Sequence, residues 1–240
     1  MLIRIVRTQH STKTNILSRA AESALAHRAA SQVISALWNG EPALSFEVIK
    51  DALGKPRVNI DCDGTQSACP ISWAHAYPYA LAAGIRNESM DIGADIERVR
   101  RFRREVITAF LTDRECAHVL EREEATRAYH TTLTWSIKEA ILKSIGLGLR
   151  LNPRRIDVTE ALTLPNYHIG FAYVDNIRVP LQIWKHRTAD SHFVAAAVAI
   201  HRNYTYTLRN GFFLERSLGS APGCALGYRP DGRPPFGEHL

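Results

Sequence analysis

Cysteine is scarce in this chain, and its distribution argues against a disulfide scaffold or a zinc centre. Of 240 residues only four are cysteines, Cys62, Cys69, Cys116 and Cys224, and no two of them form a C-x-x-C pair. Disulfide frameworks and structural zinc sites both use thiols at characteristic close spacings. We therefore expect reduced cysteines and assign none of them a catalytic role.

Long apolar runs are also missing. The sequence has no stretch of about eighteen apolar residues, the minimum for a transmembrane helix. Residues 1–7 (MLIRIVR) lack the long apolar core of a signal peptide. These absences predict a cytoplasmic protein that does not insert into a membrane.

Acidic residues are outnumbered by basic ones. The chain has 30 lysines and arginines against 24 aspartates and glutamates, a formal net charge of +6. A basic surface favours anionic partners such as nucleotides, nucleic acids or acidic proteins, and charge alone does not choose among them. The hydrophobic share of 45% is enough for one large domain or two small ones.

Residues 90–97 (MDIGADIE) read as a strand that carries two carboxylates on one face. Residues two apart on a strand point the same way, so Asp95 and Glu97 project together and Ile96 packs on the other side. Two neighbouring carboxylates repel each other unless a cation lies between them. This pattern predicts a bound cation.

Residues 134–145 (TWSIKEAILKSI) read as a helix that Gly146 and Gly148 end. Glu139 and Lys143 stand four residues apart and therefore share one helix face. Lys138 lies beside that face. Glu139 could add a third carboxylate to those of the strand, and three hard oxygen ligands with open positions suit Mg²⁺.

These two stretches resemble a known family. G-A-D-I-E at 93–97 and W-S-I-K-E-A-I-L-K at 135–143 closely resemble the two signatures of 4'-phosphopantetheinyl transferases, and their separation of about forty residues also fits. These enzymes move phosphopantetheine from coenzyme A to a serine of a carrier protein. The chain length resembles the longer, monomeric Sfp (surfactin-synthetase-activating) type.

The resemblance implies a Mg²⁺-dependent reaction, with Mn²⁺ as the alternative metal. Asp95, Glu97 and Glu139 would hold the ion beside the pyrophosphate of coenzyme A, and adenosine 3',5'-bisphosphate would leave. Glu139 is the expected general base, with Lys138 as its competitor, and Lys143 would neutralise charge on the phosphates.

It also implies residues that bind coenzyme A in the first half of the chain. Lys55 and Pro56 match the family's G-K-P turn, and Lys143 is expected to contact the same ligand. Arg28 is the match for a phosphate contact from the first helix. His75 matches the histidine of a Ser-His-Ser pattern that binds the 3'-phosphate in the family.

The two serines of that pattern are absent here, because Ala74 and Ala76 stand in their places. Each missing hydroxyl removes a hydrogen bond worth on the order of 1 kcal/mol or somewhat more to a charged acceptor. The substitution bears on the tightness of 3'-phosphate binding rather than on the reaction class.

A basic run follows the acidic strand. Five of the seven residues 98–104 are arginines. Because carrier proteins present an acidic helix beside the modified serine, the segment between Arg98 and Phe110 is the expected docking surface, with Val106, Ile107 and Phe110 as its apolar part. Nucleic-acid binding through this run is the weaker interpretation, since aromatic residues are sparse in it.

The expected fold class is α+β, with two structurally similar α/β halves related by a pseudo-two-fold axis, as the resemblance implies. The expected division is an N-terminal half at 1–104, a C-terminal half at 105–205 and a flexible tail at 206–240, because the last stretch is rich in glycine and proline. The expected helices are 16–37, 106–124 with a break at 111–113, and 129–145. The expected strands include 2–6, 46–49, 90–97, 156–158, 167–174, 179–184 and 192–200.

A non-catalytic module that binds coenzyme A or a carrier on the same scaffold is the alternative function. Ala74 and Ala76 allow this alternative, whereas the intact acidic and basic residues of the two motifs argue against it.

Overall fold

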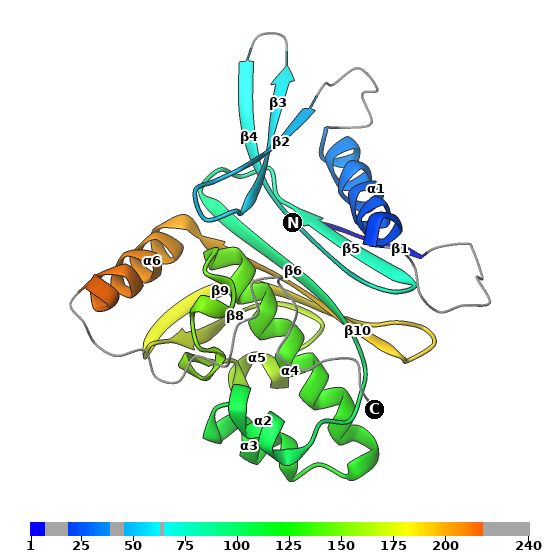
Figure 1. The fold of residues 1–240 in the computed structure, drawn as a ribbon, viewed down its shortest axis with the longest axis vertical. Helices are drawn as coiled ribbons and strands as arrows, with labels where there is room; N and C mark the ends of the chain where they lie inside the picture. The colour runs from blue at the N-terminus through cyan, green and yellow to red at the C-terminus, as the bar shows by residue number, and fades with distance from the viewer. Residues whose placement is uncertain (8–18, 39–45, 63–64, 218–240) are drawn as a thin grey trace.

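The computed structural model describes residues 1–7, 19–38, 46–62 and 65–217 and folds them into two five-stranded antiparallel sheets (Figure 1). The first sheet has the strand order β1-β5-β4-β3-β2. Its strands are β1 (Leu2–Arg7), β2 (Phe46–Lys50), β3 (Pro56–Cys62), β4 (Thr65–Ala76) and β5 (Tyr79–Gly84). The long helix α1 (Arg19–Leu37) packs on this sheet.

The second sheet repeats this arrangement. Its strand order is β6-β10-β9-β8-β7. The strands are β6 (Met90–Arg98), β7 (Ile156–Asp157), β8 (Tyr167–Val174), β9 (Ile177–Arg187) and β10 (Phe193–His201). The long helix α4 (Glu124–Ile145) follows β6 in the chain and packs on this sheet, as α1 follows β1 and packs on the first.

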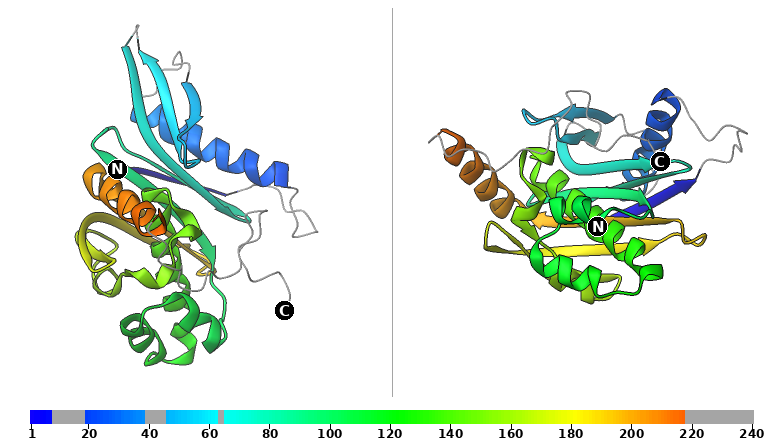
Figure 2. Two further views of the ribbon diagram at one scale, coloured as in Figure 1. Left: turned by 60° about the vertical axis from the view of Figure 1, so that its left-hand side comes forward. Right: turned by 60° about the horizontal axis from the view of Figure 1, so that its bottom comes forward.

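Both halves therefore have one topology: a strand, a long helix and four further strands, with the first strand hydrogen-bonded to the last. This agreement confirms the expected α+β fold with two similar halves. The sheets lie between the two long helices, so the order of layers is α1, first sheet, second sheet, α4 (Figure 2).

Small residues allow these layers to approach closely. The layer between the sheets is built largely from alanines, among them Ala83, Ala94, Ala195, Ala197 and Ala199, each with no exposed surface. Under α1 alanines such as Ala26, Ala29 and Ala30 pack together with larger side chains such as Ile34 and Trp38. Burial of many short apolar side chains at high packing density stabilises both interfaces.

Shorter helices complete the second half. They are α2 (Arg104–Phe110), α3 (Asp113–Leu120), α5 (Thr159–Thr163), α6 (Arg202–Ser217) and the 3-10 turns η1 (Gly148–Arg150) and η2 (Pro153–Arg155). The break expected at 111–113 separates α2 from α3. Thr112 caps α3 in a capping box with Glu115.

Two element positions differ from the sequence expectation. Strand β6 was placed in the N-terminal half, yet its hydrogen-bond partner is β10 of the second sheet. Helix α6 occupies part of the stretch expected as a tail, and its buried Leu208 and Phe212 join the core beneath α4. Residues 218–240 lie outside the described residues, and the division into domains stays a prediction. No helix in the described ranges is long and apolar enough to cross a membrane.

Candidate active site

Strand β6 presents its two faces as the sequence predicts. Ile92, Ala94 and Ile96 pack into the layer between the sheets. The intervening positions, which include Asp95 and Glu97, therefore face the opposite side, where α4 lies.

Gly93 determines how closely α4 can approach this strand. A Cβ atom added at Gly93 would lie 1.8 Å from the carbonyl oxygen of Ala140 and 2.7 Å from the backbone nitrogen of Ser144. Only a glycine lets the helix backbone rest directly on the strand. Glu139 and Lys143, which flank this contact on α4, are thereby brought beside the strand carboxylates.

Lys143 forms the central ion pair of the site. Its Nζ lies 2.6 Å from Asp95 Oδ1 and also donates to the carbonyl of Ala94 at 3.2 Å. Burial opposes the charge on Lys143, but the Asp95 and Glu139 carboxylates outweigh burial and raise its pKa. Lys143 is thus held as a cation against the carboxylates.

The other two carboxyl groups, those of Glu97 and Glu139, have raised pKa values. Burial raises the pKa of Glu97 to about 7, and the neighbouring Asp95 adds to the shift. Burial also raises the pKa of Glu139 to about 7, where Lys143 opposes the shift and Asp95 adds to it. Trp135 Nε1 donates to Glu97 Oε1 at 3.3 Å, which fixes that side chain. Burial is therefore the main reason that both carboxyl groups are weaker acids than free glutamate.

The expected three-carboxylate metal cluster is not assembled among the described residues, where no group of three or more His, Cys, Asp or Glu side chains is arranged to hold a metal ion. The donor set nevertheless fits a hard divalent cation. Asp95 Oδ2 is buried without a hydrogen-bond partner in the described part of the chain. Glu97 and Glu139 lie close enough for Asp95 to raise the pKa of each, and carboxylate oxygens are the ligands that Mg²⁺ prefers.

Lys138 lies elsewhere, so the structure does not bring this expected competitor for the base to the carboxylates. Its side chain has no exposed surface, and its Nζ lies 2.5 Å from Glu115 Oε2. The same ammonium donates to the carbonyls of Phe110 at 2.8 Å and Pro153 at 3.0 Å. Adjacent helix positions are about 100° apart, so Lys138 points toward α3 when Glu139 points toward β6.

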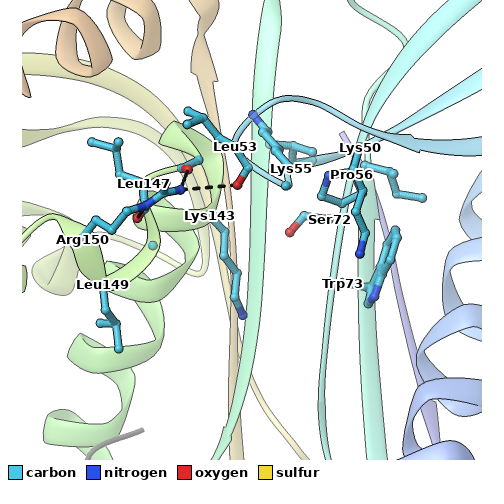
Figure 3. A pocket seen from close by; sticks show the side chains of 15 residues that line it. Lys50, Leu53, Lys55, Pro56, Ser72, Trp73, Lys143, Leu147, Leu149 and Arg150 are labelled. Carbon is cyan, nitrogen blue, oxygen red and sulfur yellow. Dashed lines mark hydrogen bonds between the residues drawn. The ribbon is translucent and has the colours of Figure 1, made fainter. Parts of the chain in front are cut away.

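A cleft of about 640 Å³, which Lys143 helps to line, lies between the two halves (Figure 3). One wall comes from β2, the turn before β3, and β4, and the other from the end of α4 and η1. The basic residues Lys50, Lys55, Lys143 and Arg150 line it together with Pro56 and Trp73. Four basic side chains on one cleft favour an anionic ligand.

Lys55 and Pro56 line the cleft, but the ammonium of Lys55 is engaged elsewhere. Its Nζ lies 2.6 Å from Asp91 Oδ1 and 2.6 Å from the carbonyl of Ser144. Burial lowers the pKa of Lys55 to about 8, although Asp91 opposes the shift. Its charge serves mainly to join the two halves of the protein.

His75 and Arg28 are not among the side chains that line this cleft. His75 is exposed on β4, two positions after Trp73, so both point from the same face of the strand. Arg28 is exposed on α1, next to His27, whose ring lies 5.6 Å from the Trp73 ring. The structure therefore does not bring either expected contact into the lining of the cleft.

Ala74 and Ala76 have a structural explanation. Both pack in the apolar layer between the two sheets, where a hydroxyl would need a hydrogen-bond partner. A methyl group suits that environment better than a serine side chain does.

Several residues of the site carry little or no signal in the sequence. Lys50, Trp73 and Arg150 line the cleft, and Arg150 Nη2 donates to the carbonyls of Gly146 at 3.1 Å and Leu53 at 3.4 Å, as the dashed lines in Figure 3 mark. A basic residue directly after the glycine turn was the available signal for Arg150. No sequence pattern around Lys50 marks it as a residue of the site.

The expected docking surface needs one correction. The five arginines at 98, 100, 101, 103 and 104 are exposed, as a docking surface requires. Ile107 and Phe110, however, are each only 3% exposed, because they pack with Leu111 and Trp135 in a small core. These two side chains cannot contact a partner.

Comparison with known proteins gives a family for part of the chain. Residues 91–198, a little under half of the chain, match the model of the 4'-phosphopantetheinyl transferase superfamily. This segment contains β6 and α4 with all four residues of the carboxylate and lysine cluster. No curated protein matches the chain.

Among solved structures, the holo-[acyl-carrier-protein] synthase of Thermotoga maritima is similar to this chain at 17% sequence identity. The match covers 46% of this chain and 62% of that one, with a TM-score of 0.32. The chain therefore matches less than two thirds of that protein, and a TM-score this low does not establish a shared fold.

Proposed function

We propose that this protein transfers 4'-phosphopantetheine from coenzyme A to a serine hydroxyl of an apo carrier protein. The observation that carries the proposal is the meeting of β6 and α4. Lys143 pairs with Asp95 and lines a basic cleft, and Glu97 and Glu139 lie near enough to interact electrostatically with Asp95, all within the segment that matches the transferase superfamily. The Sfp type suggested by chain length remains a prediction.

The cleft supplies the binding site for coenzyme A in this proposal. Lys143 reaches from α4 toward the carboxylates, where the pyrophosphate would lie. Lys50 and Trp73 stand on the opposite wall (Figure 3), where they suit the nucleotide, because a flat aromatic ring stacks on a base and an ammonium attracts a phosphate. Arg150 holds the turn after α4 through its hydrogen bond to the carbonyl of Gly146.

Asp95, Glu97 and Glu139 would hold one Mg²⁺, or Mn²⁺ in its place. When bound, the ion would neutralise the developing charge on the phosphate oxygens. The orphaned Asp95 oxygen supports a cation here, because it lacks a partner, and burial, the main cause of the raised pKa values of Glu97 and Glu139, leaves both carboxyl groups short of stabilising charge.

Glu139 is the general base of the proposed reaction. Burial raises the pKa of its carboxyl to about 7 in the metal-free protein, and a bound cation would lower it again, so Glu139 would be an ionised carboxylate able to accept a proton at neutral pH. As Glu139 takes the serine proton, the serine oxygen bonds to the β-phosphorus of coenzyme A, and the bond from that phosphorus to the bridging oxygen breaks. Adenosine 3',5'-bisphosphate leaves with the electron pair, while Lys143 balances phosphate charge. Lys138 has no part in this step.

The exposed arginines of residues 98–104 are the proposed contact for the acidic helix of the carrier. They follow directly after Glu97, so a carrier bound there would have its serine near the carboxylates. Arg101 is paired with Glu124 at 3.1 Å on the surface, and exposed pairs of this kind exchange partners at little cost. The monomeric state and cytoplasmic location stay predictions.

The test is incubation of the purified protein with coenzyme A, Mg²⁺ and a panel of apo acyl and peptidyl carrier proteins, followed by intact-mass measurement. The proposal expects a gain of one phosphopantetheinyl group on at least one carrier. No gain on any carrier, in a preparation that binds coenzyme A by calorimetry, would instead favour the non-catalytic binding module. Ala74 and Ala76, which stand where the family pattern has serines, are the feature that allows that alternative.

A further inference from the structure

Helix α6 lies beyond residue 198, where the superfamily match ends, yet it contacts the elements that form the cleft. Its apolar side packs Leu208 and Phe212 into the core beneath α4. Its polar side carries Thr205 and Arg209, which reach a buried carboxylate and the end of α4. The helix is therefore more than an appended surface element.

Asp91 is the carboxylate at the centre of these contacts, and it has no exposed surface. It accepts hydrogen bonds from Lys55 Nζ at 2.6 Å and from Thr205 Oγ1 at 2.5 Å. Arg57 Nη2 lies 3.4 Å away and Arg209 Nη2 lies 3.9 Å away. Burial alone would raise the pKa of Asp91, but the Lys55 cation and these hydrogen bonds outweigh it and lower the pKa.

Arg209 connects this cluster to the end of α4. Its Nε donates to the carbonyl of Ile145, the last residue of that helix. The next residue, Gly146, has a left-handed φ of +85°, and a Cβ added there would meet Arg209 Nη2 at 3.2 Å. The guanidinium thus lies against the turn that leads from α4 into η1.

The cluster holds three cations around one carboxylate, with Asp51 Oδ2 at 3.9 Å from Arg209 Nη1 as a second acidic group. Arg209 Nη2 is buried without a hydrogen-bond partner among the described residues. The Arg209 side chain is 17% exposed, so its unpaired Nη2 costs less than that of a fully buried cation, and its other contacts hold it in place. Arg209 does not line the cleft itself, but it lies against Gly146 of one wall and near Asp91, which binds Lys55 of the other.

Both walls depend on the same cluster. Lys55 belongs to one wall, and it bonds Asp91 and the carbonyl of Ser144 near the end of α4. Gly146 and Arg150 belong to the other wall, and Arg209 contacts the first of them. A movement of Arg209 would therefore free the turn after α4 and the pair that joins the two halves.

We propose that α6 is a clamp for the cleft and that Arg209 is its positioning residue. Arg209 contacts the turn after α4 directly and Lys55 through Asp91, and in this way it holds the turn and Lys55 in fixed positions relative to each other. The clamp keeps the two walls at the separation that coenzyme A needs, so this role rests on the proposed function. It touches neither substrate nor the reacting atoms.

The experiment compares Arg209→Met with Leu208→Ala, a matched control on the same helix that loses core packing and keeps the charge. Amide hydrogen exchange of residues 146–150 is measured first, without any ligand. If the clamp exists, exchange should be faster by on the order of tenfold in Arg209→Met, because loss of a hydrogen bond from a charged group changes an opening equilibrium by about tenfold. Leu208→Ala should show little change in these residues. Equal exchange in Arg209→Met and the wild type would overturn the clamp.

Kinetics then separate positioning from general destabilisation. Arg209→Met should raise KM for coenzyme A about tenfold and leave KM for the carrier within about twofold, and Arg209→Lys should recover part of the loss. The same rise in KM for coenzyme A in Leu208→Ala would show a merely structural effect and refute the positioning role. A wild type that transfers nothing defeats the proposed function, whereas the exchange comparison still decides whether the clamp exists.

Discussion

Replacement of Lys138 by methionine tests the assignment of this residue to structure rather than chemistry. Lys138 and Glu115 form an ion pair whose side chains both have no exposed surface. Removal of one partner of such a pair leaves an uncompensated buried charge, which costs about 3–5 kcal/mol of the free energy of unfolding. For a chain of this size that corresponds to a fall in Tm of roughly 6–20 °C.

A second substitution identifies the cause of the loss. Glu115→Gln in the Lys138→Met background removes the stranded charge, while the amide oxygen can still accept from the backbone of Thr112 or Val158. The double variant should therefore regain at least about 1 kcal/mol relative to Lys138→Met. Urea denaturation of the wild type, both single variants and the double variant measures this coupling.

Transfer assays complete the test. Well below its Tm, Lys138→Met should keep its rate within about tenfold of the wild type, because a lost general base would cost about 10²–10⁴-fold. A Lys138→Met protein that is as stable as the wild type but inactive would refute the reasoning, since it would make Lys138 a chemical group after all.

Three further predictions follow from the site. Gly93→Ala should destabilise the protein strongly and abolish transfer, because its Cβ would overlap the carbonyl of Ala140; thermal melts and the transfer assay check this. Glu139→Gln should stabilise the metal-free protein at pH 8 but not at pH 4. The pKa of the Glu139 carboxyl is raised from 4.5 to about 7 by folding, so the stability of the wild type falls as pH rises from 4.5 to 7. Urea midpoints at both pH values measure it, and equal midpoint shifts would contradict it. Lys50→Ala should raise KM for coenzyme A several-fold at low salt and less at high salt, because an exposed charge is screened; a salt-independent effect would exclude the electrostatic contact.

The strand and helix of the central motif could be read from the sequence because their chemistry is local. Period-two alternation places Asp95 and Glu97 on one face of β6, and a spacing of four places Glu139 and Lys143 on one face of α4. The structure agrees on both faces. Gly93 adds the reason for their proximity, which only the packed structure displays.

Several residues have surroundings that depend on contacts between distant segments, which the sequence does not reveal. The direction of Lys138 is determined by Glu115 on α3, and the ammonium of Lys55 is engaged by Asp91, 36 positions later. Ile107 is buried because α2 and α3 fold against Trp135. No local pattern encodes which of several basic or apolar side chains a later segment will cover.

Helix α6 was missed for a related reason. Its glycine, Gly211, and the glycine- and proline-rich stretch after it favour an irregular tail when only composition is considered. In the structure, Leu208 and Phe212 bury their side chains against α4, and Arg209 reaches the turn after that helix. Tertiary packing therefore stabilises a helix that local propensity supports weakly.

The most direct test of the central claim is the intact mass of an apo carrier protein after incubation with coenzyme A, Mg²⁺ and either the wild type or Asp95→Asn. Asn is nearly isosteric with Asp but lacks the charge that pairs with Lys143. The account predicts that the wild type adds one phosphopantetheinyl group and that Asp95→Asn, folded and at equal concentration, adds none in the same time. Modification by both proteins at the same rate would contradict it.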